Sequence, residues 1–370
     1  MSVNNIAVLS LLVCIFLILF LVIDIKGKFD NYLKDKDEKP LVTAAIIIGI
    51  LFLLYGLLSP FISDYFFDFR KDEDGKLTKL NPNELGDTLG GTIGPFVAAA
   101  GVIFTFLAFY MQKLANDDIK KQFKIQQFEN QFYEMVRLHK ENVNEIELER
   151  KDIEGVVKGR AAFYEMKKEL EVLLTFDKEF HKEDVEPKRF VQVYKKFWWG
   201  FANEVKFNWC TPFIFADYDL NSYDYQLQLL KNDEEGFKLF DSQIMLNSNL
   251  KINFLNGHHT YLGHYFRHLF QTVKYVVNQN FLSFDQKLQY LRILRAQLSN
   301  YEQVMLFYNW LSGYGAGWEN EKNKFFTEFK MIHNLWYSEL YETEFISNAI
   351  EDLKNTSVKL RVGNLFEADD

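Results

Sequence analysis

Three long apolar runs occupy the first third of the chain, at residues 6–25, 41–62 and 89–111. Each has about the 20 residues that an α-helix needs to cross the hydrocarbon core of a bilayer. The second run, LVTAAIIIGILFLLYGLLSPFI, contains no charged side chain, and the third is richer in glycine and alanine. The pattern therefore predicts a membrane domain over residues 1–111 with three transmembrane helices.

The first run could instead be a cleaved signal peptide. The preceding sequence, MSVNN, has no positive charge, and the run is followed by IDIKGKFD where a signal peptide would have a small-residue cleavage site. A retained membrane anchor is therefore the favoured interpretation.

The positive charges near the ends of the runs predict an orientation, because cytoplasmic loops retain Lys and Arg. Nine lysines lie in the first loop and directly after the third run, against four basic residues in the second loop: Lys26, Lys28, Lys34, Lys36, Lys39, Lys113, Lys120, Lys121 and Lys124, against Arg70, Lys71, Lys76 and Lys79. We therefore expect a multi-pass membrane protein with its N-terminus outside. Residues 112–370 would lie in the cytoplasm.

Beyond the third run, apolar residues recur at helical spacing from Gln112 to about Arg150, which predicts a helical connector over residues 112–154. The same spacing continues in KEDVEPKRFVQVYKKFWWGFANEV, FDQKLQYLRILRAQLSNYEQVMLFYNWL and ENEKNKFFTEFKMIHNLWYSELYETEFI. Alternating strand patterns are scarce. The sequence therefore predicts an all-α fold, with a helical cytoplasmic domain over residues 155–353 and a flexible tail over residues 354–370.

Composition narrows the functional classes. Phe, Tyr and Trp make up 17% of the chain, and in a helical domain such residues mostly fill the core. The net charge of -9 argues weakly against nonspecific binding of nucleic acid. The only cysteines, Cys14 and Cys210, exclude a disulfide framework and suit a reducing compartment. No Walker sequence, nucleophile elbow or kinase signature occurs, and no cofactor is predicted.

Small residues recur four apart near the third apolar run, at Gly86, Gly90, Gly94 and Ala98. This spacing places them along one ridge of a helix, where another backbone can approach closely. The ridge would pack against another helix of the same chain or against a second copy, so a homo-oligomer through the membrane helices is one expectation.

The stretch GHHTYLGHYFRHLFQTVKYV, residues 257–276, holds four of the seven histidines. On a helix its apolar residues share one side, while His264, His268, Gln271 and Tyr275 lie on the other with Arg267 at its flank. This polar face contains no acidic residue, unlike an ordinary solvated face built of Glu and Lys.

Histidine and arginine together suit anion binding or phosphodiester chemistry. A histidine exchanges protons near neutral pH, and an arginine can hold a phosphate through two parallel hydrogen bonds. His264, Arg267 and His268 are the candidate catalytic residues, with Gln271 and Tyr275 as candidate ligand-binding residues. The competing interpretation is a polar face that packs against another part of the protein. A metal site is not predicted, because the fixed charge of Arg267 would oppose a bound dication.

The next predicted helix contributes Arg295 and Glu302 as further candidate ligand-binding residues, which share a face with Ser299 in RILRAQLSNYE. Arg295 lies among leucines, and a buried charge needs a partner. Glu302 is the favoured partner, and a bound phosphate is the alternative.

Taken together, LGDTLGGTIGPF, QFENQFYEMVRLHKENV and LGHYFRHLFQTVKYV followed by LRAQLSNYEQVMLFYN resemble the putative phage abortive infection proteins, the AbiC-like group of bacterial defence proteins. These segments span most of residues 85–310. The resemblance implies a bacterial protein that stops the growth of phage-infected cells, in response to a phage or host trigger that the sequence does not identify.

Several abortive infection families contain HEPN ribonucleases, whose signature is an Arg and a following His separated by four to six intervening residues. Arg267 is followed at those places by Thr272, Val273 and Lys274, so the signature is absent there. The leading hypothesis is therefore a membrane-anchored antiphage protein whose cytoplasmic domain binds a partner or an anionic ligand. The alternative is a HEPN-like, metal-independent ribonuclease tethered to the membrane, with RNA as its substrate, and catalysis stays open.

Overall fold

The computed structural model describes residues 39–67, 69–71, 77–79, 82–150, 155–200, 251–252, 256–360 and 364–367. The apolar run at residues 6–25 and both cysteines lie outside these ranges. Helices account for 73% of the described residues. The prediction of a mostly helical protein is confirmed.

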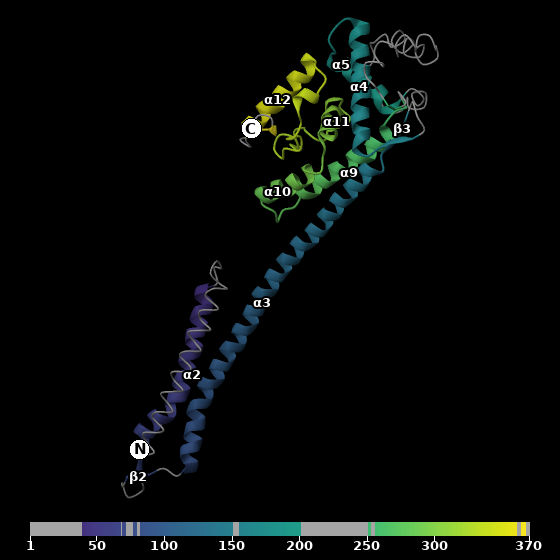
Figure 1. The fold of residues 1–370 in the computed structure, drawn as a ribbon. Helices are drawn as coiled ribbons and strands as arrows, with labels where there is room; N and C mark the ends of the chain where they lie inside the picture. Colours follow the sequence, from purple (N-terminus) through teal and green to yellow (C-terminus); the bar gives the residue numbers. More distant parts are fainter. Residues whose placement is uncertain are drawn as a thin grey trace, which may run out of the picture. The chain divides into compact units, whose positions relative to one another are not determined.

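The chain divides into two compact units, residues 1–126 and 127–370. In the first unit, helix α2 (Lys39–Phe67) is followed by a short antiparallel hairpin of β1 (Phe69–Lys71) and β2 (Leu77–Lys79). Helix α3 (Pro82–Asn144) begins after the hairpin and continues without interruption into the second unit (Figure 1).

The α2–α3 contact is close at two glycines of α2. A Cβ atom at Gly49 would lie 2.9 Å from the ring of Phe104, and one at Gly56 would lie 3.2 Å from the side chain of Val97. These glycines admit the side chains of α3, which is how small residues bring apolar helices together.

The predicted ridge on α3 does not make this contact. Among the described residues, nothing lies within 4 Å of a Cβ atom placed at Gly90 or Gly94, and both glycines are exposed, as is Ala98. The side-chain surroundings of Gly86 lie outside the described residues. The use of this ridge for packing stays a prediction.

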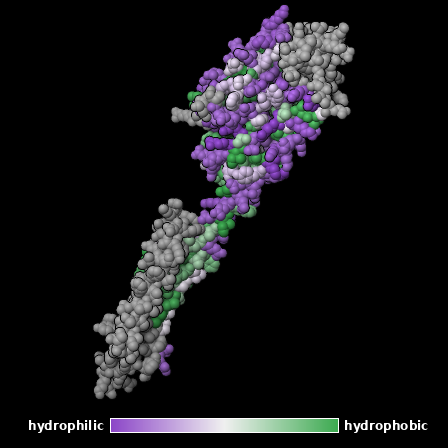
Figure 2. All heavy atoms as spheres, viewed as in Figure 1, coloured by the Kyte–Doolittle hydropathy of each residue, from purple (hydrophilic) through white to green (hydrophobic). Residues whose placement is uncertain are grey.

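One helix among the described residues is long and apolar enough to cross a membrane, and it lies within α3 over Ile93–Asn144. Only 11% of its apolar window is buried within the protein, and Val102, Phe106 and Phe109 are 70%, 62% and 67% exposed. Figure 2 shows hydrophobic residues along this part of α3, whereas hydrophilic residues dominate the visible face of the second unit. Length and composition therefore support one spanning helix, while α2 contains a shorter apolar stretch, Val42–Gly56. Three spanning helices stay a prediction.

The second unit gathers its helices around the end of α3 (Figure 1). Its elements are the hairpin strands β3 (Glu147–Glu149) and β4 (Val156–Lys158), then α4 (Arg160–His181), α5 (Pro187–Trp199), α9 (His259–Val277), α10 (Phe284–Arg295), α11 (Asn300–Leu311), the 3₁₀ turn η3 (Tyr337–Glu339) and α12 (Glu344–Leu360). The predicted helical connector is thus too long. The helix ends at Asn144, because Leu148 turns into the core on a strand that pairs with β4.

Helix α9 packs antiparallel to the C-terminal part of α3. The ring of Phe128 stacks on Tyr275 at 5.3 Å, and eleven residues farther along α3 the ring of His139 lies 5.2 Å from Tyr265. The opposite face of α9 is buried through Leu262, Leu269 and other apolar side chains, as its two-faced pattern predicts.

RILRAQLSNYE spans two helices where the sequence analysis expected one. Ser299 is the N-cap of α11, and it exchanges capping-box hydrogen bonds with Glu302, while Ser283 and Gln286 start α10 in the same way. Arg295 therefore ends one helix and Glu302 begins the next.

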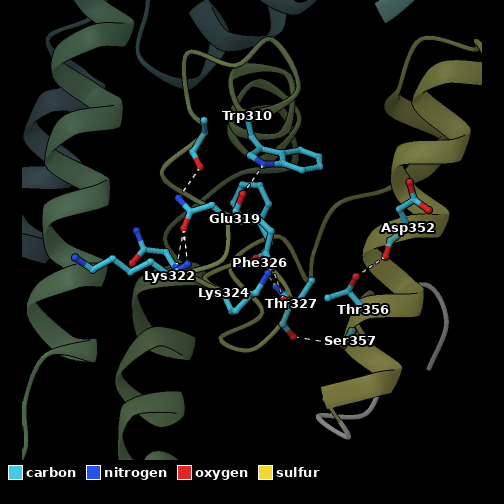
Figure 3. A network of polar contacts seen from close by, with 12 residues as sticks. Trp310, Glu319, Lys322, Lys324, Phe326, Thr327, Asp352, Thr356 and Ser357 are labelled. Atoms are coloured by element: carbon cyan, nitrogen blue, oxygen red, sulfur yellow. Dashed lines mark hydrogen bonds and ion pairs between the residues drawn. The ribbon is translucent and has the colours of Figure 1, made fainter.

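The segment around ENEKNKFFTEFKMIHNLWYS is built of turns, although its spacing predicted a helix. The carboxylate of Glu319 accepts hydrogen bonds from the backbone N–H groups of Phe326 (2.9 Å) and Thr327 (3.1 Å), and its backbone carbonyl accepts one from the Trp310 indole (Figure 3). The side-chain oxygen of Asn320 accepts hydrogen bonds from two further backbone N–H groups, those of Lys322 and Asn323. These side chains compete with the helical hydrogen-bond ladder, and the turns result.

The predicted flexible tail is wrong for its described residues. Helix α12 continues to Leu360, and the side chain of Ser357 donates a hydrogen bond to the Thr327 carbonyl. Leu365 and Phe366 beyond it are 2% and 0% exposed. Their burial in the core holds this part of the tail.

Candidate functional site

His258, the first histidine of GHHTYLGH, has a structural role at the start of α9. His258 is 2% exposed, and its Nε2 atom lies 2.7 Å from a carboxylate oxygen of the buried Glu169 on α4. The preceding Gly257 has φ +78°, and a Cβ atom there would lie 2.5 Å from the backbone of Trp199. Gly257 and His258 thus fix the start of α9 against α4 and α5. The ring of the next residue, His259, lies 4.7 Å from that of Trp199.

His264 and Arg267 are exposed on α9, as the sequence analysis predicted for a polar face. The Nε atom of Arg267 donates a hydrogen bond to the Gly263 carbonyl one turn earlier, 2.9 Å away. The guanidinium therefore lies back along its own helix.

His268 and Tyr275 are half-buried against α3. The His268 ring stacks on that of His139 with centroids 6.2 Å apart, and Tyr275 stacks on Phe128. Gln271 is exposed. The structure thus separates the predicted constellation: His264, Arg267 and Gln271 face outward, and the other two residues contact another helix.

Arg295 and Glu302 do not pair with each other. Arg295 donates a hydrogen bond to the carbonyl of Lys330, 2.8 Å away, and burial lowers the pKa of its guanidinium to about 10. A backbone carbonyl thus takes the place of the carboxylate that the sequence analysis favoured as its partner.

The buried Glu302 is the centre of a set of polar side chains from four helices, here called the Glu302 cluster: His139, Arg160, Tyr265, His268, Ser299 and Glu302. The Glu302 carboxylate is 0% exposed. It accepts hydrogen bonds from the Ser299 N–H (2.7 Å), the Ser299 hydroxyl (2.6 Å) and the Tyr265 hydroxyl (3.2 Å). The Nε atom of Arg160 lies 3.6 Å from its second oxygen. The carboxylate is therefore well satisfied.

His139 is the member of the cluster whose hydrogen bonds are missing. It is 1% exposed, and neither ring nitrogen has a hydrogen-bond partner among the described residues. A carboxylate oxygen of Glu302 lies 3.9 Å from Nε2. The buried Nδ1 atom of the neighbouring His268 also lacks a partner. Native proteins seldom leave buried polar atoms unsatisfied, so these three nitrogens mark a place for a ligand or a solvent molecule.

Burial sets the protonation of the cluster. It lowers the pKa of His139 to about 4, with the positive charge of Arg160 contributing, and it lowers the pKa of His268. Burial also raises the pKa of Glu302, against the hydrogen bonds from Ser299. Near neutral pH both histidines are uncharged, and each can both donate and accept a hydrogen bond.

Arg160 is the member of the Glu302 cluster with the most exposed side chain. Its side chain is 60% exposed, although its Nε atom approaches Glu302 and its Nη2 atom donates to the Gln297 carbonyl, 2.7 Å away. His264, one turn before His268, adds a second exposed polar group. The described residues hold no group of three or more His, Cys, Asp or Glu side chains arranged to bind a metal ion.

The sequence analysis missed His139 and Arg160. His139 has a signal in the sequence, because it continues the spacing of the core positions Phe128, Phe132 and Val143 on the same helix. A titratable residue at an apolar position of an amphipathic helix is a candidate for function. No comparable signal marks Arg160, which reaches Glu302 across 142 positions of the chain only through the tertiary fold.

The helices α9 and α11, which supply part of this cluster, lie within a segment that matches a known family. Residues 257–340 match the family described as putative phage abortive infection protein, putAbiC. The resemblance to an AbiC-like family is confirmed for this segment, which supports a role in antiphage defence. Comparison with curated proteins and with solved structures found no match.

The abortive infection segment contains most of the Glu302 cluster. It begins at Gly257 and ends within the turns that follow Glu319. It supplies Tyr265, His268 and Glu302, while His139 and Arg160 come from helices outside it. The cluster is therefore where the matched segment meets α3 and α4.

The buried His139 should make the protein sensitive to acid. Its pKa is lowered from 6.5 to about 4, so the unfolded chain binds the proton more readily and stability falls as pH drops through this window. The loss attributable to His139 should reach roughly 3 kcal/mol at most. Denaturant unfolding at about pH 7, 6 and 5, which covers the upper part of this pH range, measures the loss of stability.

The comparison with His139→Phe isolates this contribution, because phenylalanine keeps a ring against Tyr265 but cannot titrate. The pH dependence should be weaker in this variant than in the wild type. His264→Phe, at an exposed position, is the matched control and should leave the dependence unchanged. Equal slopes for all three proteins would contradict the assignment. The titratable and charged groups around His139 are Glu302, Arg160 and His268. These three residues are the same in all the proteins compared.

Proposed function

We propose that this protein is a membrane-anchored antiphage protein acting by abortive infection, whose helical domain binds a partner or an anionic ligand. The observation that carries the proposal is the continuity of α3. One helix runs from an apolar segment of spanning length into the unit that holds the abortive infection segment. A continuous helix of this kind connects the apolar segment directly to the domain that follows it.

The arrangement in the membrane is part of the proposal. Three spanning helices, at about residues 6–25, 41–62 and 89–111, would anchor the chain in the bacterial inner membrane with the N-terminus outside. The helical unit would then lie in the cytoplasm. Copies could associate through the exposed glycines of α3, where a neighbouring helix can approach closely.

Binding is favoured over cleavage of RNA. A ribonuclease would use two histidines as acid and base and an arginine as a phosphate clamp, and the Glu302 cluster contains these residue types. His139 is 1% exposed, however, and a polymer backbone cannot reach it without local opening. A HEPN-like ribonuclease remains the alternative to the binding function.

The exposed pair on α9 tests the proposal. His264→Ala and Arg267→Ala remove no buried side chain, so the unfolding free energy should change by only about 0.5 kcal/mol. Protection of cells against phage should nevertheless be lost, as measured by plating efficiency alongside the protein level. Lys274→Ala, at an exposed site on the same helix, is the control and should protect normally.

Two outcomes would count against this face. If both alanine variants fold and protect normally, the outward side of α9 is not the functional surface. If protection falls only in step with the amount of folded protein, the residues are structural. Arg267→Lys separates a clamp from long-range attraction, because lysine keeps the charge but loses the planar fork.

A further inference from the structure

The Glu302 cluster leaves three hydrogen-bonding nitrogen atoms without partners on two adjacent rings. They are both ring nitrogens of His139 and the Nδ1 atom of His268, on two rings that stack at 6.2 Å. The carboxylate beside them already accepts three hydrogen bonds and contacts Arg160. The unsatisfied capacity therefore belongs to the imidazoles.

The charges around the imidazoles determine which ligand would suit them. Arg160 is fixed as a cation and balances Glu302, so the surroundings of the two neutral rings carry little net charge. Protonation would turn both rings into double donors. The exposed Arg160 of the cluster and the exposed His264 beside His268 can also donate hydrogen bonds. An acceptor-rich anion complements this set of donors, and the described residues hold no group of three or more His, Cys, Asp or Glu side chains that would bind a metal cation.

We propose that His139, His268 and Arg160 form a binding site for the phosphate group of a small phosphorylated ligand, and that binding is accompanied by uptake of protons on the histidines. This rests on the proposed function and names the chemical class of its anionic ligand. The site commits to a small ligand because His139 is 1% exposed, and a terminal phosphate is small enough to approach it where a polymer backbone is not.

Each group has a distinct part in this site. Arg160 has 60% of its side chain exposed, and its Nη1 atom has no hydrogen bond or ion pair among the described residues, so it can meet the phosphate first. His268 is half-buried and His139 lies behind it, and a phosphate oxygen would satisfy nitrogens that now lack partners. The negative charge then favours the protonated imidazoles, which are unfavourable in the empty site.

Calorimetric titration of the full-length protein in detergent tests the proposal. Adenosine 5′-monophosphate and inorganic phosphate are the two probes, and adenosine is the uncharged control. Titration near pH 6.5, close to the ordinary histidine pKa, in two phosphate-free buffers of different ionisation enthalpy measures the protons taken up. We expect AMP to bind with proton uptake and adenosine not to bind. Comparison of the two probes distinguishes a nucleotide from free phosphate as the source of the group.

Substitutions locate the site. Arg160→Gln should weaken AMP binding by about tenfold or more, since charge-assisted hydrogen bonds are lost. Arg292→Gln removes an exposed arginine from α10 and should leave binding unchanged. His139→Phe should abolish most of the proton uptake. If that variant does not fold, proton uptake by the wild type and the Arg160 comparison still decide the matter.

Several results would overturn the proposal. Adenosine binding as well as AMP, binding without proton uptake, or equal effects of the two arginine substitutions would each exclude a phosphate site here. A single-stranded RNA without a terminal phosphate that competes with AMP would show that a polymer enters. Protection of infected cells is measured separately. If the protein protects cells but does not bind phosphate, this inference alone is overturned. If it binds phosphate but does not protect cells, the proposed function is overturned.

Discussion

Gly257→Ala is expected to lower the free energy of unfolding by more than about 4 kcal/mol, which is exceptional for one methyl group. The backbone at this glycine has φ +78°, and its new Cβ atom would lie 2.5 Å from both the carbonyl carbon and oxygen of Trp199. These are backbone atoms, so they cannot move aside as a flexible side chain would. The start of α9 would have to shift, and the buried contact of His258 with Glu169 would be lost.

A second glycine separates the two causes of this effect. Gly313 has φ +85°, but nothing lies within 4 Å of a Cβ atom placed there. Gly313→Ala should therefore cost only the backbone penalty of a left-handed residue, about 1–2 kcal/mol. Denaturant unfolding of both variants, followed by near-ultraviolet circular dichroism, gives the comparison. Equal losses would show that the contact with Trp199 is relieved by a small adjustment.

The helices with strong two-faced patterns could be predicted from the sequence. In α9 the spacing of Leu262, Leu269 and Val273 predicted the buried side, and these residues are fully buried. Periodicity reports which side of a helix is apolar, and it does so without knowledge of the partner. The exposed positions of His264 and Arg267 followed from the same pattern.

The partners of polar residues could not be predicted in this way. The half-buried His268 turns toward His139 of α3, which precedes it by more than a hundred positions, and Arg295 bonds a backbone carbonyl rather than Glu302. A helical wheel places residues on a face, but the neighbouring element decides what each one touches. This is why the sequence indicated a histidine site on α9 without its second half on α3.

Local capture of backbone groups explains the largest error in secondary structure. The segment after Glu319 has helical spacing. The Glu319 carboxylate nevertheless accepts hydrogen bonds from the backbone N–H groups of Phe326 and Thr327 (Figure 3). The spacing of apolar residues alone does not reveal such a contact. Ser299 shows the opposite case, since a serine followed three residues later by glutamate is a helix-start signal that the sequence contains.

The largest loss within the cluster is expected for Glu302→Ala, which should lower the free energy of unfolding by about 3–5 kcal/mol. The carboxylate is 0% exposed and accepts from Ser299 and Tyr265, and it faces Arg160 at 3.6 Å. Its removal leaves the buried Tyr265 hydroxyl without its acceptor and takes away half of a capping box. Glu302→Gln should recover part of the loss, because an amide oxygen can still accept from the Ser299 N–H.

Helix α10 provides the matched control for this prediction. Gln286 occupies the same third position of a capping box, behind Ser283, but it is exposed. Gln286→Ala should therefore lose only the cap, at a cost of about 1 kcal/mol. Denaturant unfolding of the three variants beside the wild type measures the difference. If Glu302→Ala cost no more than Gln286→Ala, the contacts to Tyr265 and Arg160 would contribute nothing to stability. Glu302 would then be retained as a helix cap and not as the centre of a buried site.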